Sequence, residues 1–359
     1  MSSAAVKRFS TLDPVLTDRP GSTMLEHIKY LKYRHPLVYE RLDKAVILDT
    51  DELVRRARRV GAIQGHGDFD DNERGAAYRA GQLATPHARE YGDRKIFAEI
   101  ERRLGGFGFK QVGLDVIGGN GTTARVAANL LPLVDMPTII AGDPNLDMVN
   151  DALLRGHPAV WQSAQETMFA DKSLDFVIGS RGFHHVGPDA RGTAFGEARR
   201  ILRPGGVFLM VDFEEGSPTA RWYSEGLDTH TNTGHRFSHF RREELMTLLI
   251  GAEFAEASVF EIYDPFRFWA DTAEGARNTL LEHVIGMFGM VRLRRNPDEA
   301  ERQYWARIDR TVAPWCTFRA DEVAFDTEGS RRLSVFQEAD GRWCAEFPRI
   351  TLCAAGMRR

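Results

Sequence analysis

The segment 113–124 reads Gly113-Leu-Asp115-Val-Ile117-Gly118-Gly119-Asn120-Gly121-Thr-Thr-Ala124. A short apolar run ends in an acidic residue, turns on glycines and opens a helical run. Glycines let the backbone approach a ligand closely, and the first turn of a helix presents unpaired N–H groups. The segment therefore predicts a ligand-binding strand–turn–helix unit with Asp115 at the tip of the strand. The turn residues expected at the ligand are Ile117, Gly118, Gly119, Asn120 and Gly121.

Strands and helices alternate on both sides of this unit. The predicted strands are 112–117, 138–142, 159–161, 174–179, 206–213, 255–263 and 350–355. The predicted helices between them are 122–131, 144–155, 188–202 and 240–250. Such alternation is typical of βαβ units around a parallel sheet. We expect an α/β fold, a Rossmann-like, seven-stranded and mostly parallel sheet with helices on both faces.

Two flanking regions depart from this rhythm. Residues 1–108 are helical in pattern from about 22 onward and predict an N-terminal helical cap or lid. The core is expected at 109–263 plus 346–359. Residues 264–345 predict a late α+β insertion that covers the substrate site or forms a dimer contact. Its predicted helices are 273–290 and 297–312, followed by a β-like tail at 331–337 and 342–347.

Composition limits the partners. The 359-residue chain has a formal net charge of -4, and 43% of its residues are hydrophobic. This balance gives no electrostatic footprint for nucleic acid or an anionic membrane. No apolar run of 18 residues and no signal-peptide core occur, and three scattered cysteines predict reduced thiols. We expect a cytoplasmic protein with a small-molecule substrate, no nucleic-acid or membrane partner, and a possible homodimer built on the aromatic insertion.

The glycine turn admits two interpretations. Gly119-x-Gly121-x-x-Ala124 fits a dinucleotide fingerprint, with Asp143 about 20 residues on for a ribose hydroxyl. However, a carboxylate at Asp115 would repel a pyrophosphate and attract an ammonium group such as that of S-adenosylmethionine. Asp143 and Pro144 end the next strand, where a carboxylate suits ribose hydroxyls in either case. Each aspartate could instead only cap the following helix.

The same stretches resemble class I S-adenosylmethionine-dependent methyltransferases, over residues 112–263 and 349–356. The glycine loop is similar to that family's first motif, and Asp143 matches its acidic ribose ligand. The most specific match is Glu197-Ala-Arg-Arg-Ile-Leu-Arg-Pro-Gly-Gly206, similar to the family's segment before the fifth strand. The chain departs from the family at Ile117, where a glycine is usual, and at Ser163, where many relatives have an aspartate.

The resemblance implies further cofactor contacts. Ser163, Ala164 and Gln165 fall where the family contacts adenine, and Ser180 and Arg181 begin the loop after the fourth strand. In members of that family, the helix just before the first strand closes over the cofactor. Tyr78, Arg89 and Tyr91 lie there, and Tyr91 is the predicted lid residue near the methionine carboxylate, although an ordinary amphipathic face would look the same.

The implied activity is methyl transfer from S-adenosylmethionine to the oxygen, nitrogen or carbon of a small molecule, giving S-adenosylhomocysteine. Natural-product biosynthesis is the expected setting. Two alternatives stay open: an NAD(P)-dependent oxidoreductase on a Rossmann fold, and a repurposed relative that binds the cofactor without methylating.

Histidines beyond the strand ends are the candidate general bases. His184 and His185 follow the fourth strand, and His230 and His235 lie in the segment after the fifth. Each could instead pack or bond to backbone. The spacing of His230, His235 and His239 resembles a metal pattern, but no predicted helix holds them together, so no metal site is predicted.

Overall fold

The computed structural model describes residues 23–64, 73–132, 135–319 and 330–359. Its main sheet has the strand order β3-β2-β1-β4-β5-β10-β6. The strands are β1 (Val112–Asp115), β2 (Thr138–Asp143), β3 (Ala159–Trp161), β4 (Leu174–Ser180), β5 (Leu202–Asp212), β6 (Ala255–Tyr263) and β10 (Ile350–Met357). β10 runs antiparallel to β5 and β6, whereas the pairs from β3 to β5 are parallel. The predicted seven-stranded, mostly parallel sheet is confirmed.

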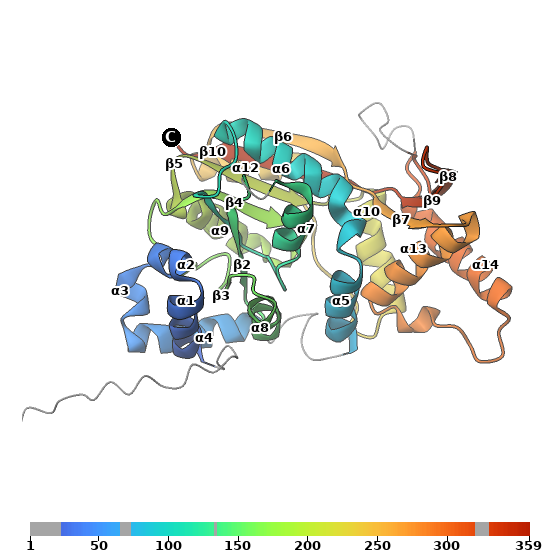
Figure 1. Ribbon diagram of the computed structural model, residues 1–359, viewed down its shortest axis with the longest axis horizontal. Helices are drawn as coiled ribbons and strands as arrows, with labels where there is room; N and C mark the ends of the chain where they lie inside the picture. The colour runs from blue at the N-terminus through green and yellow to red at the C-terminus, as the bar shows by residue number, and fades with distance from the viewer. Residues whose placement is uncertain (1–22, 65–72, 133–134, 320–329) are drawn as a thin grey trace, which may run out of the picture.

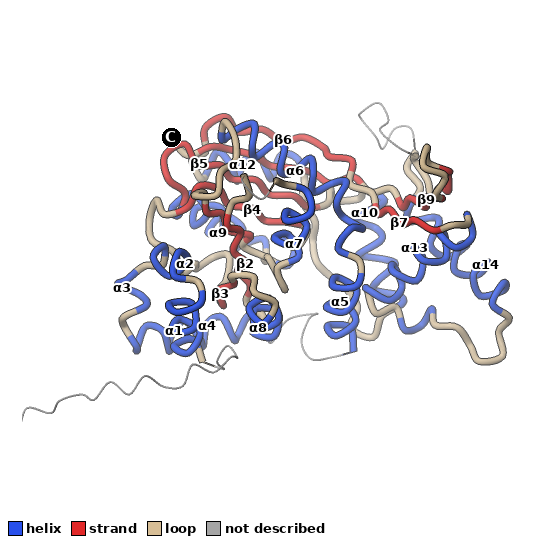
Figure 2. Tube along the Cα trace, viewed as in Figure 1, coloured by secondary structure: helices blue, strands red, loops and turns tan. Residues whose placement is uncertain are grey.

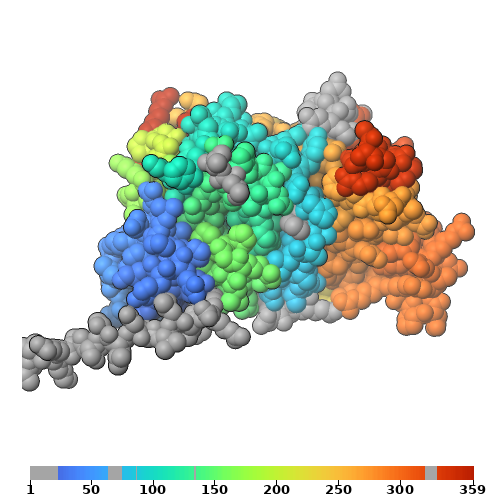
Figure 3. All heavy atoms as spheres, viewed as in Figure 1, coloured from blue at the N-terminus to red at the C-terminus, as the bar shows by residue number. Residues whose placement is uncertain are grey.

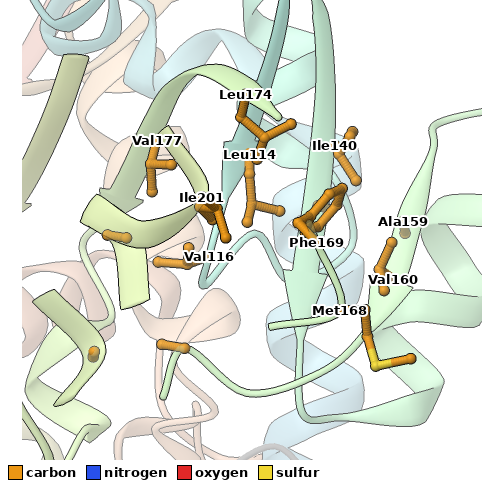
Figure 4. Close-up of a cluster of buried hydrophobic side chains, with 14 of the residues drawn as sticks. Leu114, Val116, Ile140, Ala159, Val160, Met168, Phe169, Leu174, Val177 and Ile201 are labelled. Carbon is orange, nitrogen blue, oxygen red and sulfur yellow. The ribbon is translucent and has the colours of Figure 1, made fainter. Parts of the chain in front are cut away.

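Helices cover both faces of this sheet (Figure 2). On one face, α6 (Glu90–Leu104) and α7 (Thr122–Leu130) bury Phe97 and Ala127 against Phe176 and Val207. On the other face lie α8 (Leu146–Leu154), α9 (Pro188–Ile201) and α12 (Arg242–Gly251). Figure 4 shows the apolar cluster of this second face, where side chains of β1, β2 and β4 meet Phe169 and Ile201. Burial on both sides fixes the strands whose carboxyl ends carry the polar residues.

The N-terminal helices fall into two groups (Figure 1). The first group comprises α1 (Met24–Arg34), α2 (Pro36–Arg41), α3 (Lys44–Ile47) and α4 (Thr50–Gln64). Its apolar residues join the core of the second sheet face. Then α5 (Glu73–Ala84) and the 3₁₀ turn η1 (Pro86–Arg89) cross the carboxyl end of the sheet and lead into α6.

The late residues form their own cluster at the opposite end from the first helices (Figure 3). Its elements are β7 (Phe266–Ala270), α13 (Ala273–Met287), η4 (Val291–Leu293), α14 (Glu301–Val312), η5 (Ala313–Cys316), β8 (Ser334–Gln337) and β9 (Trp343–Phe347). The strands pair in the order β7-β9-β8, all antiparallel. The two expected helices and the two tail strands are present with shorter bounds. The strand β7 is not predicted from the sequence, and its partner β9 lies more than 70 residues further along the chain.

The segment between β5 and α12 carries several of the predicted site residues. It contains α10 (Pro218–Arg221), the π-helical turn η3 (Trp222–Leu227) and α11 (Asp228–His230). Trp222 and Tyr223 of η3 are buried against the late cluster. This segment therefore joins the sheet edge to the insertion. In the described part of the chain, no helix has both the length and the apolarity needed to cross a membrane.

Candidate functional site

A cavity of about 580 Å³ opens at the carboxyl ends of β1, β2 and β4. Ligands of open α/β sheets bind at this edge. Of the residues predicted at the cofactor, the cavity is lined by Asp115, Ile117, Gly118, Gly119, Asn120, Asp143, Ser180 and Arg181. Its other lining residues include Tyr78, Gln82 and Arg89 of α5 and η1, together with His185. The structure thus brings the glycine turn and the lid region together around one space.

Asp115 lies buried at the end of β1. Its Oδ2 accepts a hydrogen bond from Thr123 Oγ1 at 2.6 Å, and its Oδ1 accepts one from the Ile117 N–H at 3.2 Å. Burial raises the pKa of Asp115 to about 6, although these donors act in the opposite direction. A carboxylate that is costly to keep charged in the empty protein is stabilised by a cation that enters the cavity.

Asp143 ends β2 on the neighbouring wall. Its Oδ2 accepts from the Gly119 N–H at 3.0 Å and its Oδ1 from the Asn145 N–H at 2.8 Å. Burial, together with the nearby charge of Asp115, raises the pKa of Asp143 to about 7. The carboxylate is held by backbone donors on both sides and retains lone pairs toward the cavity, where it can accept hydrogen bonds from hydroxyl groups.

The backbone of the turn requires its glycines. A Cβ on Gly118 would lie 2.7 Å from Ala141 Cα, and Gly119 has a φ of 51°. Ile117, the departure from the family pattern, has room because the facing residue is Gly182. A Cβ on Gly182 would lie 2.7 Å from Ile117 Cγ2. Ile117 and Gly182 are therefore complementary, and the branched side chain fits in the cavity wall.

Arg89 and Tyr78 form the roof over the turn. Arg89 is buried, and its Nη2 donates to Tyr78 Oη at 3.4 Å. Within the residues that the structure describes, no ion pair joins Arg89 to a carboxylate. The predicted lid residue Tyr91 does not line the cavity. Its ring packs on Tyr263 and under Arg267.

Arg181 is fixed beneath the roof. Its guanidinium pairs with Asp264 through Nε and Nη2, both at 2.7 Å, and with Asp93 through Nη1 at 2.6 Å. Arg349 Nη2 also contacts Asp264, at 2.9 Å. All of these side chains are buried, so Arg181 is held as part of the wall rather than free to reach a ligand.

Other predicted cofactor residues lie outside the lining of the cavity. Gly121 is the left-handed N-cap of α7, and its N–H donates to the Gly118 carbonyl. The Pro144 carbonyl accepts from Trp161 Nε1 at 2.8 Å. Ser163, Ala164 and Gln165 follow β3, where Ser163 bridges to Glu166. Their predicted adenine contacts stay predictions.

A smaller chamber of about 280 Å³ adjoins the cavity. The two spaces share Tyr78, Arg181 and His185 as walls. The remaining walls of the chamber are His184, Tyr223, His235 and Phe288. Three of the four predicted histidine bases therefore meet here. His230 does not: it is half-exposed at the end of α11, with its ring against Trp315 at 5.8 Å between centroids.

His184 is the centre of the chamber's polar contacts. Its Nδ1 lies 2.8 Å from Asp212 Oδ1, and its Nε2 lies 3.3 Å from His235 Nε2. Asp212 also accepts from the backbone N–H groups of His184 and Phe213. These contacts outweigh burial and lower the pKa of Asp212, whereas burial lowers the pKa of His184. An ionised Asp212 requires a proton on His184 Nδ1 and leaves a lone pair on Nε2.

His239 is a further member of this cluster and is not among the predicted bases. Its ring is buried, with its centroid 4.9 Å from that of His184, and neither ring nitrogen has a hydrogen-bond partner. Asp212 and His239 belong to β5 and the loop before α12, at separations of 28 and 55 residues from His184. No local sequence pattern could reveal that association.

The chain is similar in sequence to known methyltransferases. Residues 114–210 match the family described as a methyltransferase domain. A ubiquinone/menaquinone biosynthesis C-methyltransferase UbiE from Rubrivivax gelatinosus is 31% identical over 126 residues, which cover 34% of this chain and 47% of that protein. The match therefore spans about half the length of that curated relative.

Two solved structures can be superposed on much of the chain at low sequence identity. Phosphoethanolamine N-methyltransferase 2 of Haemonchus contortus, in complex with phosphomonomethylethanolamine and S-adenosylhomocysteine, is 18% identical with a TM-score of 0.41, covering 73% of this chain and 52% of that one. The YcgJ protein of Bacillus subtilis is 16% identical with a TM-score of 0.43, covering 74% and 98%.

Proposed function

We propose that this chain, which carries a class I S-adenosylmethionine-dependent methyltransferase domain, binds that cofactor in the large cavity and methylates a small molecule held in the adjoining chamber. The observation that carries the proposal is the set of charges around the cavity. Two buried carboxylates, Asp115 and Asp143, and two buried guanidinium groups line the same space: Arg181, which is paired with Asp93 and Asp264, and Arg89, which is not paired with a carboxylate of the described residues.

These charges fit the polar groups of the cofactor. Asp115 would bind the ammonium group of the methionine moiety, and Arg89 its carboxylate. Asp143 would accept hydrogen bonds from the two ribose hydroxyls. Arg89 takes the role predicted for Tyr91. A nicotinamide dinucleotide fits less well, because its pyrophosphate would lie against the buried Asp115.

The chamber sets the size of the acceptor. Tyr223 and Phe288 form part of its wall, and the chamber is small and recessed beside the cofactor cavity, which suits a small molecule rather than a polymer. Bound S-adenosylmethionine supplies a methyl group on a sulfonium: the acceptor's oxygen, nitrogen or carbon bonds to the methyl carbon while the carbon–sulfur bond breaks and its electron pair stays on sulfur. His184, His185 and His235 face the acceptor side, where they can orient the acceptor and take up the proton it loses.

The remaining parts of the prediction follow from this assignment. We propose that residues 1–108 act as a cap whose α5 and η1 close the cavity, that 109–263 plus 346–359 bind the cofactor, and that 264–345 close the chamber. A homodimer, a cytoplasmic location and a role in natural-product biosynthesis stay predictions.

Calorimetric titration tests the cofactor assignment. We expect S-adenosylmethionine and S-adenosylhomocysteine to bind at micromolar Kd, with NADH as the negative control. Asp115→Asn and Arg89→Gln should each weaken binding by about 10- to 100-fold, since each removes a charged hydrogen bond. Asp147→Asn makes the same charge change on α8 outside the cavity lining and should bind like the wild type. Binding of NADH in place of the sulfonium pair would refute the proposal.

A further inference from the structure

We propose that His184, His185 and His235 bind a divalent first-row transition-metal ion in the chamber beside the cofactor cavity. One nitrogen from each ring lies within 4.8 Å of the other two. The three rings come from two segments: His184 and His185 lie in the turn after β4, and His235 lies in the loop after α11. The fold, rather than a local motif, brings them to one point.

The spacing of two of these nitrogens matches that of metal ligands. His184 Nε2 and His235 Nε2 face each other at 3.3 Å. Two imidazole nitrogens, each ~2.0–2.1 Å from a tetrahedral zinc ion, lie about 3.3 Å apart. The alternative is a direct hydrogen bond between the rings, which needs a proton on His235 Nε2.

Asp212 prepares His184 for this role. Asp212 Oδ1 accepts a hydrogen bond from His184 Nδ1, with the two atoms 2.8 Å apart, and this leaves the lone pair of His184 Nε2 directed into the chamber. A carboxylate behind a ligating histidine is the usual outer partner in metal sites. Asp212 already accepts from two backbone N–H groups, so it serves as the partner of His184 rather than as a ligand of its own.

A second observation is independent of these three rings. His239 is buried against His184, neither of its ring nitrogens makes a hydrogen bond, and its Nδ1 lies 3.9 Å from Asp212 Oδ1. A buried imidazole that makes no hydrogen bond thus lies beside the proposed ligand His184, which supports a polar ligand at this point of the structure.

The donors select the class of ion. Imidazole nitrogens suit Zn²⁺, Fe²⁺, Co²⁺ or Ni²⁺, whereas Mg²⁺ and Ca²⁺ prefer oxygen ligands. Three protein ligands leave a coordination position open toward the chamber. Resting on the proposed function, that position would bind an oxygen of the acceptor, lower the pKa of an acceptor hydroxyl so that its proton leaves to solvent, and fix the oxygen against the methyl group. With the ion bound, the three rings serve as ligands and not as proton acceptors. The acceptor class is then an oxygen-bearing molecule that ligates a metal.

Cobalt binding to untagged, chelator-treated protein tests the site. We expect one equivalent of Co²⁺ to give visible d–d absorption that one equivalent of Zn²⁺ abolishes. His235→Ala and His185→Gln should each weaken Co²⁺ binding at least 10-fold. His230→Ala is the matched control, because its ring lies against Trp315 outside the cluster, and it should bind Co²⁺ like the wild type.

Titration of the same protein stocks with S-adenosylhomocysteine separates the two proposals and reports folding. Protein that binds S-adenosylhomocysteine but takes up no Co²⁺ or Zn²⁺ would overturn the metal site and leave the cofactor site intact. Equal Co²⁺ affinity in wild type, His235→Ala and His185→Gln would also overturn it. If His235→Ala fails to fold, the half-exposed His185 still decides the question through His185→Gln.

Discussion

Asp115 is a buried carboxylate whose proposed binding role and effect on stability act in opposite directions. Its pKa is about 6 in the folded chain, against an ordinary value of 3.8. Between these two values the folded state binds more protons than the unfolded state, so this residue lowers the free energy of unfolding as the pH rises. Such a residue is expected at a cation-binding site, because a cation bound in the cavity would stabilise the buried carboxylate.

The Asp115→Asn variant isolates this contribution. The amide can accept from the Ile117 N–H and donate to Thr123 Oγ1, so the hydrogen bonds survive without the charge. Relative to wild type, the ligand-free variant should gain roughly 2 kcal/mol in free energy of unfolding between pH 4.5 and 7.5. Urea unfolding at both pH values measures this, and a pH-independent difference would mean that Asp115 is not a costly buried charge.

Ile117 and Gly182 provide a second test at the residue scale. Gly182→Ala should weaken S-adenosylhomocysteine binding about 10-fold, or about 1.4 kcal/mol, because its Cβ would displace Ile117 into the cavity. Ile117→Ala in the same chain removes the Cγ2 atom that clashes and should restore most of the affinity. A double-mutant cycle by calorimetry checks this. Additive effects of the two substitutions would show that the side chains do not interact.

The sequence predicts some of these residues and not others for physical reasons. Asp115 and Asp143 end apolar strands, so their position at the sheet edge follows from the pattern. Arg89 ends the 3₁₀ turn η1 and Tyr91 lies in the first turn of α6, and the apolar pattern of this stretch does not indicate which of the two faces the cavity. His184, Asp212 and His239 meet only through the parallel strand order, which no spacing along the chain encodes.

At the scale of elements, α6 packs closely at Gly92 against Asp264, the residue that follows β6. A Cβ there would lie 1.9 Å from Asp264 Oδ1, in the buried group that pairs with Arg181 and Arg349. The seven strands and most helices follow from apolar periodicity. The strand β7 does not follow from this periodicity, because its short stretch becomes a strand only by pairing with β9, which is distant in the sequence.

Gly92→Ala should therefore reduce the free energy of unfolding by about 3 kcal/mol, since it both overpacks the contact and disturbs a buried ion pair. Gly196→Ala on α9 is the control. No atom lies within 4 Å of its added Cβ, and it should gain up to about 1 kcal/mol from helix propensity. Chemical denaturation compares the two, and equal stability of both variants would contradict the packing described for α6.

At the scale of the whole molecule, α5 connects the two ends of the protein. Tyr78 and Gln82 line the cavity, while Gln82 Nε2 contacts Met287 Sδ at 3.5 Å and Thr85 Oγ1 lies 2.7 Å from His283 Nδ1. If cofactor binds beneath α5 as proposed, it should be coupled to α13 of the late cluster through these contacts.

Hydrogen exchange tests this coupling. S-adenosylhomocysteine should slow amide exchange at least several-fold in 73–89 and, more weakly, in 273–287, because local opening of α5 would have to break contacts with the ligand. The helix α14, which does not line the cavity, should exchange at an unchanged rate. Protection confined to the glycine turn would show that α5 does not close on the ligand.

The most direct test of the account is a crystal structure of the full chain grown with S-adenosylhomocysteine. We predict the ligand in the cavity at the ends of β1, β2 and β4, with its ammonium group at Asp115, its carboxylate at Arg89, its ribose hydroxyls at Asp143 and its sulfur directed toward the chamber of His184, His185 and His235. S-adenosylhomocysteine bound elsewhere, or in this cavity with its sulfur turned away from that chamber, would contradict the account.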